Sequence, residues 1–169
     1  MKKIGLIACM LLGMASAYAQ IDEGLILDQL NELRADGCRC GNKEVKPTNE
    51  LRWNADLADV AKAYSEHLYD NNNELVVGKY MYLSHVGLDG STLEDRLKDA
   101  GMNIRYAVEN LACVEGNELM AIDHWLNNPE SCNILMDNNS TIVGVARTGK
   151  FWVMILAQPN FSKQKEEYK

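Results

Sequence analysis

The residues that most directly suggest chemistry in this sequence are four cysteines, whose thiols can form disulfide bonds or bind a metal. They are Cys38, Cys40, Cys113 and Cys132. The fifth cysteine, Cys9, lies in a predicted leader that is removed on export, and the even number left in the exported chain predicts two disulfide bonds. Cys38 and Cys40 are too close for an easy mutual bridge, so each is expected to pair with Cys113 or Cys132. The alternative, a zinc site, lacks the usual C-x-x-C type of spacing. The cysteines therefore predict bridges that tie the N-terminal region to the second half of the chain.

The first residues predict the compartment in which those cysteines are found. Two lysines precede an apolar run at residues 4–14, which is followed by small residues. This pattern is typical of a secretory signal peptide, here 1–19 with cleavage before Gln20, because the apolar run is far shorter than the roughly 20 residues that span a membrane. Alternatively, a lipobox-like stretch ends at Cys9, which would then carry a lipid anchor. We expect a secreted or periplasmic protein.

The remaining chain has the size of one domain, predicted at 20–161, with a charged tail at 162–169. The predicted leader carries two lysines and no acidic residue, so its removal changes the formal net charge from −7 to −9. Such an acidic chain is a poor binder of nucleic acids or anionic membranes. No other segment is apolar for long enough to span a membrane.

The hydrophobic periodicity predicts an α+β domain. Helical spacing and capping signals indicate helices at 21–36, 54–70, 91–101 and 117–128, the last of them stopped by a proline. Alternation and β-branched residues indicate strands at 107–112, 142–147 and 151–156, the last two joined as an antiparallel hairpin, whereas 74–90 is predicted to be irregular. Early helices with late strands favour a layered α+β domain over a parallel α/β sheet.

Several short motifs occur in the order and spacing of one family. They are Cys40-Gly41, Trp53-Asn54, Ser84-His85 with Asp89-Gly90-Ser91, Arg96-Leu97 with Gly101, Glu109-Asn110-Leu111-Ala112, Trp125 with Asn128-Pro129-Glu130-Ser131-Cys132, Val143-Gly144-Val145-Ala146, and Phe151-Trp152. This ordered set resembles the bacterial branch of the CAP superfamily, the cysteine-rich secretory, antigen five and pathogenesis-related proteins with an SCP-like extracellular domain. The resemblance implies a three-layer α-β-α sandwich with a central antiparallel sheet. It also suggests that Cys40 pairs with Cys132, which leaves Cys38 for Cys113.

The resemblance also implies a cleft in which histidine and glutamate side chains can hold a divalent metal. The matching positions are His85 and Glu109, which could bind zinc or act as a general base with its orienting acid. The second family histidine falls on Ser131, and zinc normally takes three or four protein ligands. We therefore expect no cofactor other than a weakly bound divalent metal, with His124 as a substitute ligand only if its helix faces the cleft. The predicted cleft lining is His85, Glu109, Ser131 and His124.

Simpler interpretations of the same residues stay open. His85 could be a loop histidine that bonds the backbone, and Glu109 could be a carboxylate that fixes a loop. Ser131 lacks the G-x-S-x-G surroundings of a nucleophile.

These alternatives leave several functions. The favoured one is a secreted, monomeric binding protein for a small apolar or amphipathic ligand, a lipid among them, or for an envelope partner. The alternative is a metal-assisted, peptidase-like hydrolase that uses His85 and Glu109, and loss of the second histidine makes an enzyme the less favoured of the two. A third interpretation is a purely structural extracellular module.

Overall fold

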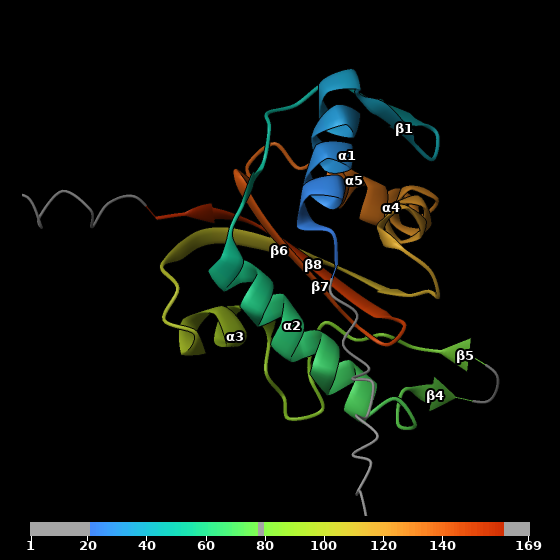
Figure 1. The fold of residues 1–169 in the computed structure, drawn as a ribbon, viewed down its shortest axis with the longest axis vertical. Coiled ribbons are helices and arrows are strands. Elements are labelled where there is room, and N and C mark those ends of the chain that lie inside the picture. The colour runs from blue at the N-terminus through green and yellow to red at the C-terminus, as the bar shows by residue number, and fades with distance from the viewer. Residues whose placement is uncertain (1–20, 78–79, 161–169) are drawn as a thin grey trace, which may run out of the picture.

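A four-stranded sheet lies between two layers of helices in the computed structural model, which describes residues 21–77 and 80–160 (Figure 1). Its strands, in spatial order, are β3 (Arg52–Trp53), β7 (Ile142–Thr148), β8 (Phe151–Pro159) and β6 (Ile104–Cys113). The β6–β8 and β7–β8 pairs are antiparallel, and only the two-residue β3 pairs in parallel, with β7. The structure is thus the predicted α+β three-layer sandwich. The predicted leader 1–19 and tail 162–169 lie outside the described residues.

Helices α2 (Ala55–Asp70) and α3 (Leu93–Asp99) cover one face of the sheet. Asn54 begins α2 because its side chain accepts a hydrogen bond from the Leu57 amide at 2.8 Å. The helix packs very closely on β7, since a Cβ added at Gly144 would lie 2.3 Å from the Ala58 nitrogen. A glycine at this position is therefore required for the contact between helix and sheet.

Helices α1 (Glu23–Asp36), α4 (Glu118–Leu126) and α5 (Pro129–Leu135) cover the other face. Two fully buried tryptophans, Trp125 and Trp152, fill the core there. The Trp125 indole donates to the Leu111 carbonyl at 3.0 Å, and the Trp152 indole donates to the Val114 carbonyl at 3.1 Å. Each ring thus buries a large apolar surface while its single donor stays satisfied.

Pro129 begins a helix, where the sequence analysis expected it only to stop one. Asn128 caps α5 by accepting from the amides of Glu130 and Ser131, and a proline suits the first helical position because the amide it lacks would have no partner there. The remaining strands form two small antiparallel hairpins, β1 (Cys38–Cys40) with β2 (Lys43–Val45) and β4 (Val76–Val77) with β5 (Tyr80–Met81). The second hairpin lies in the region that was predicted to be irregular. No helix of the described residues could cross a membrane.

Candidate functional site

The buried carboxylate of Glu109 is the centre of the candidate site. Glu109 lies on β6 and is 5% exposed. Ala107 and Leu111, two residues away on either side and therefore on the same face of the strand, pack beneath α2 and α3. One carboxylate oxygen lies 2.9 Å from Nδ1 of His85, and the other accepts from Arg96 at 2.8 Å. The structure therefore brings the two predicted residues together and adds a guanidinium that neutralises the buried charge.

Arg96 is held from several sides. Its side chain comes from α3 and is only 10% exposed, and its guanidinium carbon lies 3.6 Å from the centre of the Tyr64 ring. It also donates to the carbonyl of Ser91 at 3.1 Å. A stacked, hydrogen-bonded arginine in this setting joins α2, α3 and β6 into one polar cluster.

The Tyr64 and His67 side chains of α2 fix the loop that carries His85. The Tyr64 hydroxyl donates to the Ser84 carbonyl at 2.6 Å, and burial raises the pKa of Tyr64 to about 12, so this donor keeps its proton. Nε2 of His67 accepts from the Leu88 amide at 3.1 Å. The loop is thus bonded to α2 on both sides of His85.

The loop also stabilises its own turn. Asp89 accepts hydrogen bonds from the amide and the hydroxyl of Ser91 at 2.9 and 2.7 Å, and these bonds hold the pKa of Asp89 below its ordinary value. A Cβ added at Gly87 would lie 2.5 Å from Oδ1 of Asp89. The S-H-x-x-x-D-G-S motif therefore shapes the turn that presents the His85 ring, which is 61% exposed.

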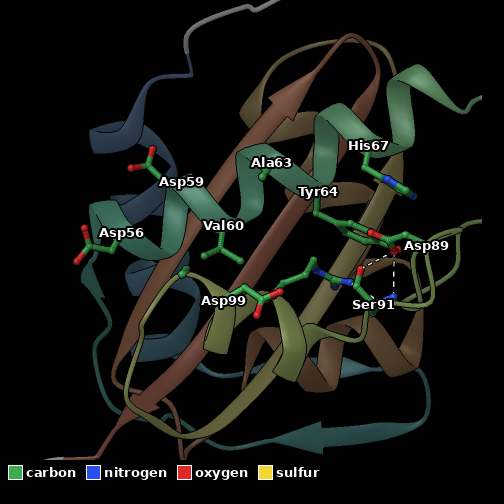
Figure 2. A pocket seen from close by; sticks show the side chains of 11 residues that line it. Asp56, Asp59, Val60, Ala63, Tyr64, His67, Asp89, Ser91 and Asp99 are labelled. Carbon is green, nitrogen blue, oxygen red and sulfur yellow. Dashed lines mark hydrogen bonds between the residues drawn. The ribbon is translucent and has the colours of Figure 1, made fainter.

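A groove of about 560 Å³ runs between α2 and α3 (Figure 2). Figure 2 shows Asp56 and Asp59 toward one end, with Tyr64, His67 and Asp89 toward the other. The lining residues are Asp56, Asp59, Val60, Ala63, Tyr64, His67, Asp89, Ser91, Arg96, Asp99 and Ala100. None of the four residues predicted to line a cleft belongs to this wall, although Tyr64 and Arg96 connect it to the His85–Glu109 pair.

Comparison with known proteins assigns the fold to a family. The family model described as CAP, the cysteine-rich secretory protein family, matches residues 27–153. The chain belongs to the CAP family. The family description names secretory proteins, and one solved relative is described as extracellular. The match confirms the resemblance to the CAP superfamily.

Individual relatives share this domain within proteins of different length. The chain is 29% identical over 103 residues to the uncharacterized membrane protein YlbC of Bacillus subtilis, and the match spans 61% of this chain and 27% of that protein. An extracellular SCP-domain protein of Bacillus anthracis is 27% identical, with a TM-score of 0.66 over 80% of this chain and 39% of its own. An outer surface protein of Borrelia burgdorferi is 20% identical, with a TM-score of 0.63 over 81% of this chain and 92% of its own.

Ser131 and His124 do not join the His85–Glu109 pair of this CAP domain. Ser131 is bonded through its carbonyl to Asn110 at 2.9 Å, and Asn110 points to the opposite face of β6 from its neighbour Glu109. His124 is exposed on α4, in the helical layer that covers that opposite face. Neither side chain contacts His85 or Glu109 in the described residues, and a cleft shared by all four residues stays a prediction.

The pair does not fit a divalent metal in this arrangement. Both oxygens of Glu109 are engaged, one of them by a permanently charged arginine. Within the ranges 21–77 and 80–160, the one group of three or more potential ligand side chains close enough to share an ion is Cys38, Cys40 and Cys132. Two ligands, one of which is already ion-paired, are fewer than zinc normally takes.

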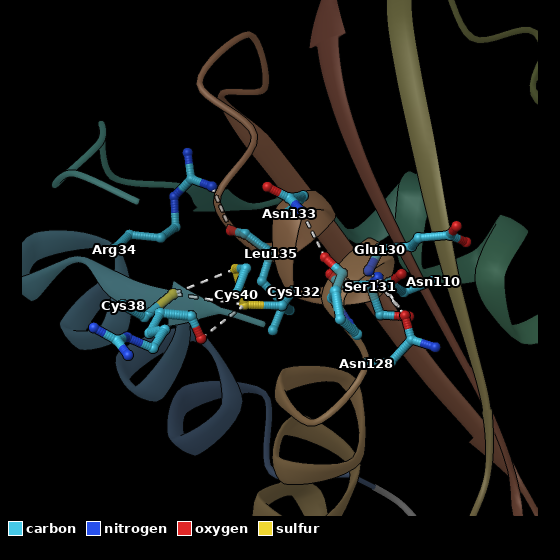
Figure 3. The surroundings of a disulfide bond; sticks show 12 residues. Arg34, Cys38, Cys40, Asn110, Asn128, Glu130, Ser131, Cys132, Asn133 and Leu135 are labelled. Atoms are coloured by element: carbon cyan, nitrogen blue, oxygen red, sulfur yellow. Dashed lines mark hydrogen bonds between the residues drawn. A yellow bond between two sulfur atoms is a disulfide. The ribbon is translucent and has the colours of Figure 1, made fainter. Parts of the chain in front are cut away.

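The structure contains the Cys40–Cys132 disulfide that the family resemblance suggested, with Cα atoms 5.4 Å apart (Figure 3). The Cys38–Cys113 pairing is wrong, because both thiols are free. Cys38 and Cys40 are two residues apart on β1, so their side chains leave the strand on the same side and both face Cys132. Cys113 instead packs in the core beneath α2.

Sequence reasoning missed the two residues that support the pair. Arg96 was noted only as part of a motif, and Tyr64 was not singled out within the helix predicted at 54–70. The available signal was the position of Arg96, directly before the buried Leu97 on the helix that follows the His85 loop. A buried acid such as Glu109 needs a charged partner, and Arg96 was the nearby candidate.

Proposed function

We propose that this CAP domain is exported and acts as a binding protein, with the groove between α2 and α3 as the site of a small amphipathic ligand. The observation that carries the proposal is the groove itself. Its volume of about 560 Å³ lies within the range of ligand pockets, which hold roughly 300–1,000 Å³. The printed descriptions of two solved relatives, as an extracellular and an outer surface protein, support export.

The charges of the groove favour a ligand with a cationic group. Asp56, Asp59 and Asp99 are exposed carboxylates on its wall, whereas the charge of Arg96 is compensated by Glu109. Val60 and Ala63 give the wall an apolar part between these acids. An amine or quaternary ammonium on an apolar chain matches both features, because the acids attract the cation and the apolar wall buries part of the chain.

A pair of probes with equal chains and opposite head groups tests this proposal. Decyltrimethylammonium and decyl sulfate are titrated into the purified protein below their micelle concentrations, with calorimetry to detect binding and circular dichroism to check the fold. We expect saturable binding of the cation and much weaker binding of the anion.

Two phenylalanine substitutions on α2 locate the binding. Ala63→Phe fills the groove and should weaken binding of the cation at least about tenfold, because the buried apolar contact is lost. Ala55→Phe adds the same ring at an exposed position outside the lining and should leave binding unchanged. Equal binding by both variants, or no saturable binding at all, would exclude the groove as the site.

The His85–Glu109 pair supports a second candidate, a hydrolase. Nδ1 of His85 lies 2.9 Å from the Glu109 carboxylate, which orients the ring, and the His85 side chain is exposed. Nε2 of such a histidine can act as a general base. A mixed peptide library incubated with the protein tests this candidate by mass spectrometry. Cleavage that persists in the natural chain and disappears in His85→Gln would make the hydrolase the better assignment.

A further inference from the structure

The free thiol of Cys38 lies against the Cys40–Cys132 disulfide. Its sulfur is 3.8 Å from the sulfur of Cys40 and 3.7 Å from that of Cys132. Figure 3 shows the three side chains together between β1 and α5. The nearly equal distances mean that the free sulfur lies beside the bond, close to both sulfurs of the bridge, so the Cys38 side chain has to move toward the bond axis before it can attack in line.

The hairpin that carries the two cysteines keeps them at this position. Both lie on β1, which pairs only with β2 among the described strands and is therefore independent of the central sheet. The turn at Gly41 has a φ of 60° and lies close to the first residue of α5, since a Cβ added at Gly41 would lie 3.0 Å from the Pro129 ring. Cys132, on the same helix, thus faces both sulfurs of the hairpin.

The three cysteine residues differ in exposure. Cys40 is 2% exposed and Cys132 is fully buried, whereas Cys38 is partly exposed. Burial, and then the nearby Glu44, raise the pKa of the Cys38 thiol, which keeps it protonated and slows its attack at neutral pH. The Cys40–Cys132 bridge is thereby the protected form, and Cys38 is the partly exposed cysteine of the three.

We propose that Cys38, Cys40 and Cys132 form a thiol–disulfide exchange site. The Cys38 thiolate attacks the sulfur of Cys132, so that a Cys38–Cys132 bond forms while the Cys40–Cys132 bond breaks. Cys40 leaves as a thiolate and takes up the proton that Cys38 released, so the exchange needs no oxidant or reductant. The alternative bridge includes the partly exposed residue Cys38, where a small-molecule thiol can attack.

The test uses the full chain with Cys9→Ser and Cys113→Ser, which leaves only the three cysteines of the site. Cys40→Ser and Cys38→Ser are each added to this background. The folded proteins are quenched in acid and alkylated in acid denaturant, and their peptides are mapped without reduction. We expect a Cys38–Cys132 disulfide in Cys40→Ser and a Cys40–Cys132 disulfide in Cys38→Ser. Alkylation of both Cys38 and Cys132 in a folded Cys40→Ser protein would overturn the proposal.

The background chain itself provides a measurement that does not depend on those variants. After equilibration at neutral pH, we expect alkylation mostly on Cys38 and a minor, reproducible fraction on Cys40. Glutathione should reduce the bridge of Cys40→Ser at least about tenfold faster than that of Cys38→Ser, because thiol exchange depends on access. No alkylated Cys40 at any time, or three reduced thiols holding stoichiometric zinc, would each contradict exchange at this site.

Discussion

The two faces of the sheet stabilise their loops by different means. On the face covered by α2 and α3, the loop with His85 is held by a buried charge, because Glu109 accepts from both His85 and Arg96. On the other face, the β1 hairpin is held by a covalent bond between Cys40 and Cys132. The first arrangement is a network of ionic hydrogen bonds, and the second closes a loop between residues 92 positions apart.

The difference predicts how each region responds to the loss of one member. A buried ion pair that loses one partner leaves an uncompensated charge, and the cost exceeds the value of the pair itself. A disulfide acts largely by restricting the unfolded chain, and here a third sulfur lies close enough to replace one of the two. We therefore expect the ionic face to be sensitive to single substitutions and the covalent face to tolerate some of them.

Substitution of Arg96 should have the largest effect. Arg96→Met removes the guanidinium from a carboxylate that is 5% exposed, and loss of one partner of a buried pair typically costs about 3–5 kcal/mol of unfolding free energy. Urea unfolding measures this difference. Arg39→Met is a matched control, since its ion pair with Glu44 is exposed and should contribute at most about 1 kcal/mol.

A double substitution shows whether the cost comes from the unpaired charge. Arg96→Met combined with Glu109→Leu removes both charges, so the stability should recover beyond that of Arg96→Met alone. If the two substitutions were simply additive, the stacking of Arg96 on Tyr64 would explain the loss better than the ion pair does.

Loss of the disulfide should come next. Cys132→Ser removes the sulfur that both hairpin cysteines face, and removal of a native disulfide typically costs about 2–5 kcal/mol. Cys40→Ser should cost clearly less, because Cys38 can take its place. Thermal unfolding of both variants and of the natural chain measures the comparison, and the natural chain is also unfolded with a chelator and with a reductant. A melting temperature that falls with chelator but not with reductant would show that metal rather than a disulfide holds this region.

The layered fold was predictable from the sequence, whereas one of its helices was not. The second helix and the final hairpin follow from apolar spacing and turn residues that act locally. A proline such as Pro129 can end one helix or occupy the first turn of the next, and here the side chain of Asn128 caps a helix that begins at Pro129. The sequence pattern alone predicted only the end of the preceding helix.

Much of the site escaped prediction because it depends on tertiary contacts. The family motifs located His85 and Glu109, yet the partner that makes Glu109 tolerable in the core comes from a different helix. The pairing of Cys38 was wrong for the same reason. Nothing local in a C-x-C segment shows that it forms a strand with both sulfurs on one side, facing α5.

Alkaline titration should expose the contribution of Tyr64. Its pKa is raised from 10.0 to about 12 by burial, so the folded state binds this proton more tightly than the unfolded state does. The associated stability is complete below pH 10 and is lost as the pH rises toward 12, with a total of about 2–3 kcal/mol if no other change occurs. Unfolding at several pH values should show a shallower decline for Tyr64→Phe than for the natural chain. Parallel curves would assign the alkaline loss to other groups.

The smallest effect is expected at His85, the most exposed member of the ionic network. Its side chain is 61% exposed, so His85→Ala should change the unfolding free energy by no more than about 1 kcal/mol, far less than Arg96→Met.

The same variant tests the metal interpretation by calorimetric titration with Zn²⁺. We expect no saturable binding at micromolar concentration in either protein, because Arg96 occupies one oxygen of Glu109 and the pair supplies only two ligands. Tight binding by the natural chain that disappears in His85→Ala would mean that a metal displaces Arg96 from Glu109. The face covered by α2 and α3 would then be stabilised by a bound metal ion instead of by the ion pair.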